Sequence, residues 1–304
     1  MFLTCIACFT QCSKGQSHRV PAATGEAAGI FSPDTLSLPM PRIPDSITDP
    51  GRRAGIFITH FWDALDFRDT LKSRSQDFLE QNFANFIAIF PIASDQARHI
   101  AVSRLMKRAA ADSIAFNLIG DIADLYLYEP NSPYFSEENY IIFLRELVKN
   151  PVTDGSHRER YQWQLESAFK NRPGDIAADF TYTTREGRRN TLLKTAVKDK
   201  LLLLFYDPDC HTCKGTIETL RNDPNIAREV REGKLTVLAV DPGYNRELWE
   251  KQASEMPEEW TVAYEDGRIE EEELYVLRAL PSLYLLDKDK KVLIKEVEPG
   301  GISN

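Results

Sequence analysis

The sequence predicts two domains, an all-α helical domain followed by an α/β domain with a mixed sheet and flanking helices. At 304 residues the chain is long enough for two domains of ordinary size. Apolar residues recur at helical spacing between about residues 51 and 170, whereas continuous apolar runs typical of buried strands begin only after Gly174. The chain is 42% hydrophobic and 27% charged, so each domain can bury a core.

The region 51–172 is predicted to form a helical domain of unknown function with five or six short helices. One apolar set at helical spacing is Phe78, Leu79, Phe86, Ile87 and Phe90. Ser136 predicts the start of a later helix, and residues 157–170 form the last one. Aromatic residues at this spacing usually belong to a core, and a binding groove is the alternative for Trp62, Tyr126, Tyr128, Tyr134 and Tyr140.

The region 173–304 is predicted to form the α/β domain. Residues 178–184 and 188–193 flank a turn glycine and indicate a hairpin. The continuous apolar runs 201–206 and 235–240 suit strands that are buried on both faces of a sheet. Helices are expected at 211–231, 244–254 and 269–277, a short strand at 260–264, and a closing hairpin at 282–287 and 292–297.

The first twelve residues carry three of the five cysteines, Cys5, Cys8 and Cys12, in an apolar segment too short to span a bilayer. The segment resembles the end of a bacterial lipoprotein signal peptide, in which a cysteine after the apolar stretch is lipidated. Cys12 fits best by position and Cys8, which follows Ala7, is the alternative. A plain cysteine-bearing tail is the other interpretation.

Residues 13–50 are rich in Ser, Gly, Ala and Pro, which predicts a flexible tether between a lipid anchor and the folded chain. We therefore expect a lipid-anchored protein of the cell envelope that faces the periplasm. The net charge of −9 argues against nucleic acid as a partner and against polybasic attraction to a membrane. The lipid anchor would then be the contact with the membrane.

Cys210-His211-Thr212-Cys213 is the motif that carries chemistry. Cys210 follows a buried strand and begins a helix, where free backbone amides and the helix dipole favour a thiolate. Cys213 falls in the same first turn, within reach of a mixed disulfide formed on Cys210. Lys214 adds positive charge nearby, and the negative charges of Asp207 and Asp209 oppose it. The direction of the net shift in the pKa of the Cys210 thiol therefore stays open.

Residues 174–298 resemble a thioredoxin-like domain of the TlpA/ResA type, the membrane-tethered bacterial thiol-disulfide oxidoreductases. The resemblance rests on the stretches 174–180, 205–214, 237–241 and 280–287. It implies thiol-disulfide exchange by Cys210 and Cys213 and a cis-proline at Pro281. It also implies that the backbone at Leu280 pairs with an extended substrate segment, as in strand addition. The helical region resembles an uncharacterised domain that precedes thioredoxin-like domains in secreted bacterial lipoproteins.

The resemblance further implies that no cofactor is needed beyond the Cys210–Cys213 disulfide itself. The partners would be protein thiols or disulfides, and a second oxidoreductase that restores the starting redox state. Whether the protein reduces, oxidises or isomerises those partners stays open.

The motif departs from ordinary thioredoxin in ways that affect its redox chemistry. His211 and Thr212 replace Gly and Pro, and a protonated imidazole beside Cys210 favours the reduced form; a solvent-facing histidine with little influence is the alternative. Leu204 stands where thioredoxin has a buried, proton-accepting aspartate. Proton transfer at Cys213 would then use water or another carboxylate, for which Glu258 and Glu259 are candidates.

Three other functions compete with redox catalysis. Structural zinc needs two further ligands at comparable spacing, and none is near the motif, so no metal is expected. A peroxidase requires a Thr-x-x-Cys context that Pro208-Asp209 does not supply. A non-catalytic thioredoxin-like module that serves as a binding or scaffold lipoprotein at the cell surface is the main alternative.

Overall fold

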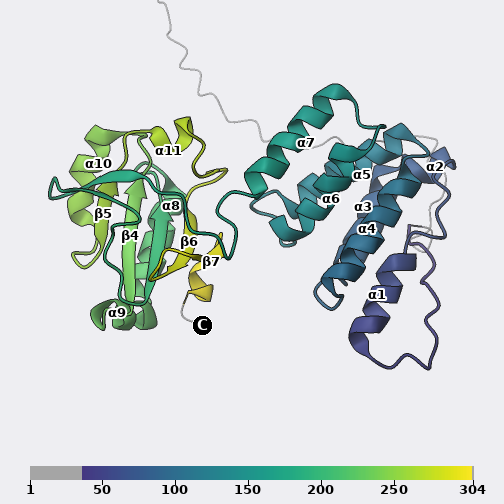
Figure 1. The fold of residues 1–304 in the computed structure, drawn as a ribbon, viewed down its shortest axis with the longest axis horizontal. Coiled ribbons are helices and arrows are strands. Elements are labelled where there is room, and N and C mark those ends of the chain that lie inside the picture. The colour runs from purple at the N-terminus through teal and green to yellow at the C-terminus, as the bar shows by residue number, and fades with distance from the viewer. Residues whose placement is uncertain (1–35, 303–304) are drawn as a thin grey trace, which may run out of the picture.

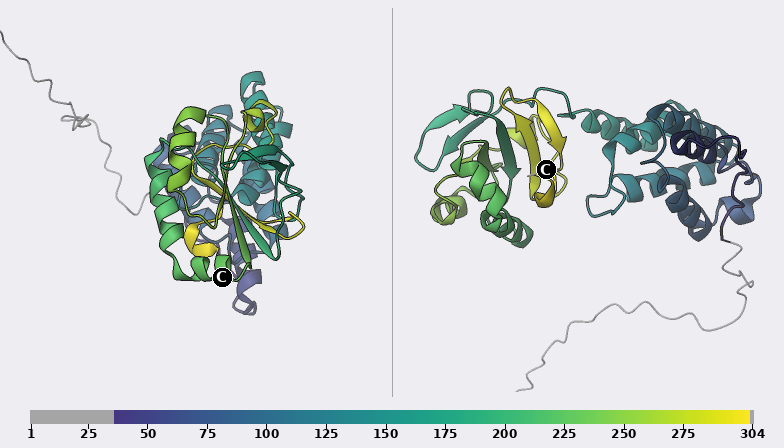
Figure 2. Two further views of the ribbon diagram at one scale, coloured as in Figure 1. Left: turned by 90° about the vertical axis from the view of Figure 1, so that its left-hand side faces the viewer. Right: turned by 90° about the horizontal axis from the view of Figure 1, so that it is seen from below.

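The computed structural model of the chain describes residues 36–302 (Figure 1). The candidate lipidation sites Cys12 and Cys8 lie outside the described residues. The described chain forms a helical half followed by a half built on a mixed sheet, which confirms the predicted fold class. The two halves lie side by side, with β6 and β7 on the side of the sheet that faces the helices (Figure 2). Between residues 36 and 302, no helix is long and apolar enough to cross a membrane.

Seven helices form the helical half as far as the structure describes it: α1 (Pro50–His60), α2 (Thr70–Ser73), α3 (Gln76–Ile87), α4 (Asp95–Ala109), α5 (Ser113–Leu127), α6 (Glu137–Lys149) and α7 (Gly155–Ala168). Each begins after an aspartate or serine whose side chain accepts a backbone N–H of the first turn: Asp49, Asp69, Ser75, Ser94, Asp112, Ser136 and Asp154. The count exceeds the predicted five or six because α2 is a single turn capped by Asp69, too short to show a periodic pattern.

The core of the helical half is largely aromatic. Phe61 contacts Trp62 and Phe86, and Phe86 contacts Phe90 with ring centroids 5.0 Å apart. Tyr128 and Tyr140 are buried and stack 4.9 Å apart. These residues take the expected core role, whereas the side chain of Tyr134 is 40% exposed.

The sheet contains seven strands within the described residues, in the order β2-β1-β5-β4-β3-β6-β7. Their bounds are β1 (Thr181–Thr184), β2 (Arg189–Thr191), β3 (Lys200–Phe205), β4 (Leu235–Asp241), β5 (Thr261–Tyr264), β6 (Ser282–Asp287) and β7 (Val292–Lys295). Strand β4 runs parallel to β3 and β5, and the other pairs are antiparallel. The sheet is therefore mixed, as predicted.

Both faces of the central strands are buried, which explains their uninterrupted apolar sequences. Leu202 and Leu204 of β3 pack beneath α8 (His211–Asn222), α9 (Pro224–Arg231) and α10 (Arg246–Gln252). Leu201 and Leu203 face the opposite side, where the chain around Phe180 and α11 (Arg268–Glu271) cover the sheet. Side chains alternate between the two faces because successive residues of a strand point in opposite directions.

Two predicted helices of this half were wrong in extent. The helix expected over 211–231 is divided into α8 and α9, because Pro224 cannot continue a helix and Asp223 caps a new one. The helix expected over 269–277 ends at Glu271, and Glu273 has a positive φ of 47°. The chain beyond it continues through turns and bends to Leu280.

Candidate active site

The motif lies at the N-terminus of α8, directly after β3. Cys210 is the N-cap residue of α8, and its Sγ accepts a hydrogen bond from the backbone N–H of Cys213 at 3.1 Å. The side chain of Cys210 is partly exposed and that of Cys213 is buried, and both are free thiols. A helix N-terminus stabilises negative charge, so the geometry favours Cys210 as the thiol that attacks a partner.

The surroundings of Cys213 hold its thiol in the protonated form. Burial raises the pKa of the Cys213 thiol to about 12, and the hydrogen bond with Cys210 acts in the same direction. A hydrogen bond from the backbone of Asp207 lowers this pKa, whereas the charge of the Asp207 carboxylate raises it. Cys213 must therefore lose its proton before it can attack.

A cis peptide bond joins Leu280 and Pro281 opposite the motif. The Cys210 thiol donates to the carbonyl oxygen of Leu280, with the sulfur and oxygen 3.7 Å apart. The structure thus brings together Cys210, Leu280 and Pro281, which the sequence separates by some 70 residues. Their part in substrate binding stays a prediction.

His211 and Lys214 are exposed on the first turn of α8. The side chain of His211 makes no hydrogen bond or ion pair within residues 36–302. Lys214 and Asp207 line one cavity of about 240 Å³ next to the motif. The predicted tuning of the redox potential would therefore act through charge at the surface.

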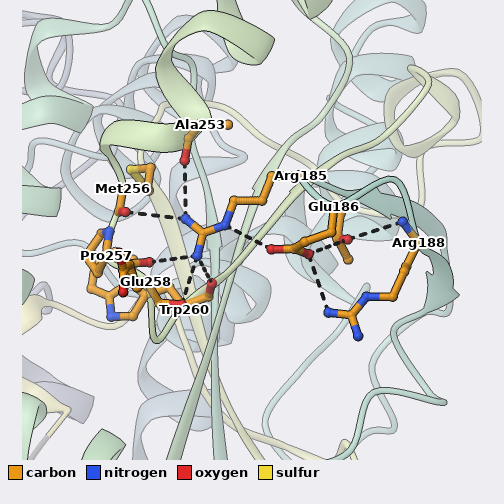
Figure 3. A network of polar contacts seen from close by, with 9 residues as sticks. Arg185, Glu186, Arg188, Ala253, Met256, Pro257, Glu258 and Trp260 are labelled. Atoms are coloured by element: carbon orange, nitrogen blue, oxygen red, sulfur yellow. Dashed lines mark hydrogen bonds and ion pairs between the residues drawn. The ribbon is translucent and has the colours of Figure 1, made fainter.

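Glu258 and Glu259, the candidates for proton transfer at Cys213, are not among the groups that shift the pKa of the Cys213 thiol. Both are exposed, in the loop between α10 and β5. Figure 3 shows the Arg185 guanidinium in the middle of this loop, donating to the carbonyl oxygens of Ala253, Met256, Pro257, Glu258 and Trp260. The carboxylate whose charge acts on Cys213 is Asp207.

A group of charged side chains beside the Leu280–Pro281 bond was not predicted. Ser282 donates to Glu296 at 3.1 Å, and burial raises the pKa of Glu296 to about 7 against the opposing charge of Arg278. Arg278 in turn pairs with Glu137 of the helical half at 3.1 Å. The only signal in the sequence was the pair Lys295-Glu296 inside a predicted strand, and its partners lie far away along the chain.

No group of three or more His, Cys, Asp or Glu side chains that could hold a metal is found in the described part of the chain.

Comparison with known protein families shows which family the helical half belongs to. The family model described as Domain of unknown function (DUF5106) matches residues 8–171. The chain belongs to the DUF5106 family. In this member the DUF5106 region is followed by the sheet and the Cys210–Cys213 motif.

One solved structure that matches over both halves supports this arrangement. A crystal structure of a thioredoxin-like protein from Bacteroides caccae is 36% identical, with a TM-score of 0.83, over 87% of this chain and 96% of that chain. The match extends over both halves, which confirms a thioredoxin-like fold after the DUF5106 region. The C-terminal domain of an uncharacterised protein from Bacteroides fragilis is 37% identical over 44% of this chain and 95% of that chain, with a TM-score of 0.42. No curated protein matches the chain.

Proposed function

We propose that this DUF5106 protein catalyses thiol-disulfide exchange on extracytoplasmic protein substrates through Cys210 and Cys213. The observation that carries the proposal is the environment of the two thiols. Cys210 is partly exposed at a helix N-terminus, 3.7 Å from the Leu280 carbonyl oxygen, and Cys213 is buried one turn later. This difference supports attack by Cys210 and resolution by Cys213.

Exchange with a substrate disulfide needs two displacements. The Cys210 thiolate attacks one substrate sulfur, forms a mixed disulfide and displaces the other substrate sulfur as a thiolate, which takes up a proton. Cys213 then loses its proton, attacks Cys210 Sγ, and releases the second substrate thiol. The substrate disulfide gains two electrons and Cys210–Cys213 is oxidised to a disulfide. The reverse sequence oxidises a substrate dithiol, and a partner oxidoreductase would restore the starting state.

The other parts of the proposal concern tuning and location. His211 and Lys214 are exposed beside the thiols, and their positive charge would favour the thiolate of Cys210. Pro281 and the backbone of Leu280 would form the floor of the substrate groove. Lipidation at Cys12, or at Cys8, would hold the protein at the cell envelope on its periplasmic side.

Cysteine variants test the function. Cys210→Ser should abolish exchange. Cys213→Ser should trap mixed disulfides between Cys210 and partner proteins, and a reductant should cleave them. Trapping by Cys210→Ser instead would reverse the two roles. If neither variant changed exchange or trapping, the non-catalytic scaffold function would replace the redox function.

Metabolic labelling with a fatty acid tests the lipid anchor. Label that is lost in Cys12→Ala would support lipidation at Cys12, and label that persists in this variant would move the lipidation site to Cys8.

A further inference from the structure

A pocket of about 220 Å³ lies beside the motif, between the two halves of the molecule. The thioredoxin-like half contributes Thr212, which stands between the two cysteines, and Pro281. The helical half contributes the loop between α5 and α6, through Asn131 and Phe135. A substrate segment lying along Pro281 would therefore touch the helical half as well.

Contacts between the halves fix this loop against the Leu280–Pro281 segment. Arg278, two residues before Leu280, donates to the backbone oxygen of Tyr128 and lies 3.7 Å from the centre of the Tyr128 ring. The same guanidinium pairs with Glu137, the first residue of α6, and Glu137 also pairs with Lys295 at 2.7 Å. All three charged side chains are at most 16% exposed, so the wall is held by buried contacts.

The pocket carries a surplus of negative charge. Arg278 and Lys295 share the carboxylate of Glu137, and Glu296 and Glu298 add two further carboxylates, so three negative charges stand against two positive ones. Glu296 and Glu298 line the pocket and form no ion pair with a basic side chain in the described residues. The Glu296 carboxylate accepts a hydrogen bond from the hydroxyl of Ser282. A lysine or arginine beside a substrate cysteine would meet attraction there, and a carboxylate would meet repulsion.

Asn131 also lines a second hollow, which lies on the helical half and is mainly apolar. Its lining includes Leu125, Tyr126 and Tyr134, and the two tyrosine rings lie 5.8 Å apart. Leu125 is 48% exposed and Tyr134 is 40% exposed, so the hollow presents adjoining apolar side chains to solvent. Apolar side chains of a bound segment could cover them.

We propose that the helical half forms the outer wall of the substrate groove and selects the protein segments that reach Cys210. The segment it fits is extended, with a basic residue beside the reacting cysteine and an aromatic side chain that packs on Leu125 and Tyr134. This inference rests on the exchange function proposed above and adds a specificity to it.

Peptides with one cysteine, activated as a mixed disulfide with thionitrobenzoate, test the inference with the full chain at about pH 8, where Glu296 is ionised. Two pairs are compared by the second-order rate constant of their stoichiometric reaction with the reduced protein: lysine against glutamate beside the cysteine, and phenylalanine-rich against serine-rich flanks. We expect the lysine and the aromatic peptides to react several-fold to about tenfold faster than their counterparts. The charge preference should weaken in high salt because exposed charges are screened.

Two variants and a control separate the walls of the groove. Glu296→Gln keeps an oxygen for the Ser282 hydrogen bond and should bring the lysine-to-glutamate ratio close to one. Tyr134→Ser removes an exposed side chain and should abolish the preference for the aromatic flank. Leu71→Ser, at an 83% exposed apolar residue elsewhere on the helical half, should change neither ratio.

The outcomes distinguish the two proposals. Exchange by the wild type with ratios near one for both pairs would overturn the groove and leave the exchange function standing. Equal effects in Tyr134→Ser and Leu71→Ser would also overturn it, because the position on the surface would then not matter. No reaction with any peptide or with 2-hydroxyethyl disulfide would overturn both.

Discussion

At the scale of single residues, the two cysteines differ in solvent contact and in their hydrogen bonds. Cys210 is open to a partner, whereas Cys213 is buried and its thiol has a pKa raised to about 12. The order in which the two thiols react should follow from this difference, because the thiolate is the reacting species.

We expect iodoacetamide to alkylate Cys210 of the reduced protein at about pH 8 while Cys213 stays unmodified. Raising the pH toward about 10 should still leave most of Cys213 protonated, because burial disfavours its thiolate. Tandem mass spectrometry of the peptide that contains both cysteines gives the two rates separately. Equal rates across this range would contradict the assigned roles.

His211→Gly tests the tuning by the residue next to Cys210. If the protonated imidazole favours the reduced form, the variant should have a lower reduction potential by up to about 30 mV, equivalent to about 1.4 kcal/mol. Identical potentials for variant and wild type would leave the helix N-terminus and Lys214 as the source of tuning.

At the scale of elements, the buried strands were predicted well and the helices after the motif less well. The runs in β3 and β4 are apolar throughout because both faces of each strand are covered. The boundary between α8 and α9 was missed although Pro224 marks it, because the apolar pattern continues through Leu220 and Ile226 into the same core. Periodicity alone does not reveal where one helix ends and the next begins.

Asp223→Ala tests the boundary between α8 and α9. The Asp223 carboxylate accepts from the backbone N–H groups of Asn225 at 2.7 Å and Ile226 at 3.2 Å. Removing this cap should lower the free energy of unfolding by about 1 kcal/mol, measured by urea denaturation. Asp199→Ala, at an exposed aspartate outside any helix, should change it by less than about 0.5 kcal/mol. Equal losses of unfolding free energy in Asp223→Ala and Asp199→Ala would argue against a stabilising helix cap at Asp223.

At the scale of the whole molecule, the two halves are joined by contacts that no local pattern reveals. Arg278 and Glu137 are 141 residues apart in the chain, and Arg278 and Tyr128 are 150 apart. The sequence therefore predicted the two halves and the cysteine motif, but not the pocket between them. Glu296 was missed for the same reason, since its role depends on side chains brought together by the fold.

A double-mutant cycle on Arg278→Ala and Glu137→Ala measures the coupling between the halves. The pair is 16% and 12% exposed, so its interaction free energy should be about 1–3 kcal/mol in urea unfolding. A more exposed ion pair between the halves, Lys170 and Glu273, is 31% and 56% exposed and should give below about 1 kcal/mol. Equal couplings for the two pairs would contradict a rigidly held groove wall.

The reduction potential of the Cys210–Cys213 pair tests the central claim most directly. The full chain is equilibrated in glutathione or dithiothreitol redox buffers, quenched, and analysed for an intramolecular Cys210–Cys213 disulfide by mass spectrometry. We expect one reversible two-electron transition between about −120 and −270 mV, the range of known exchange proteins. A pair that stays reduced in every buffer, or that forms no disulfide between these two cysteines, would contradict the redox function.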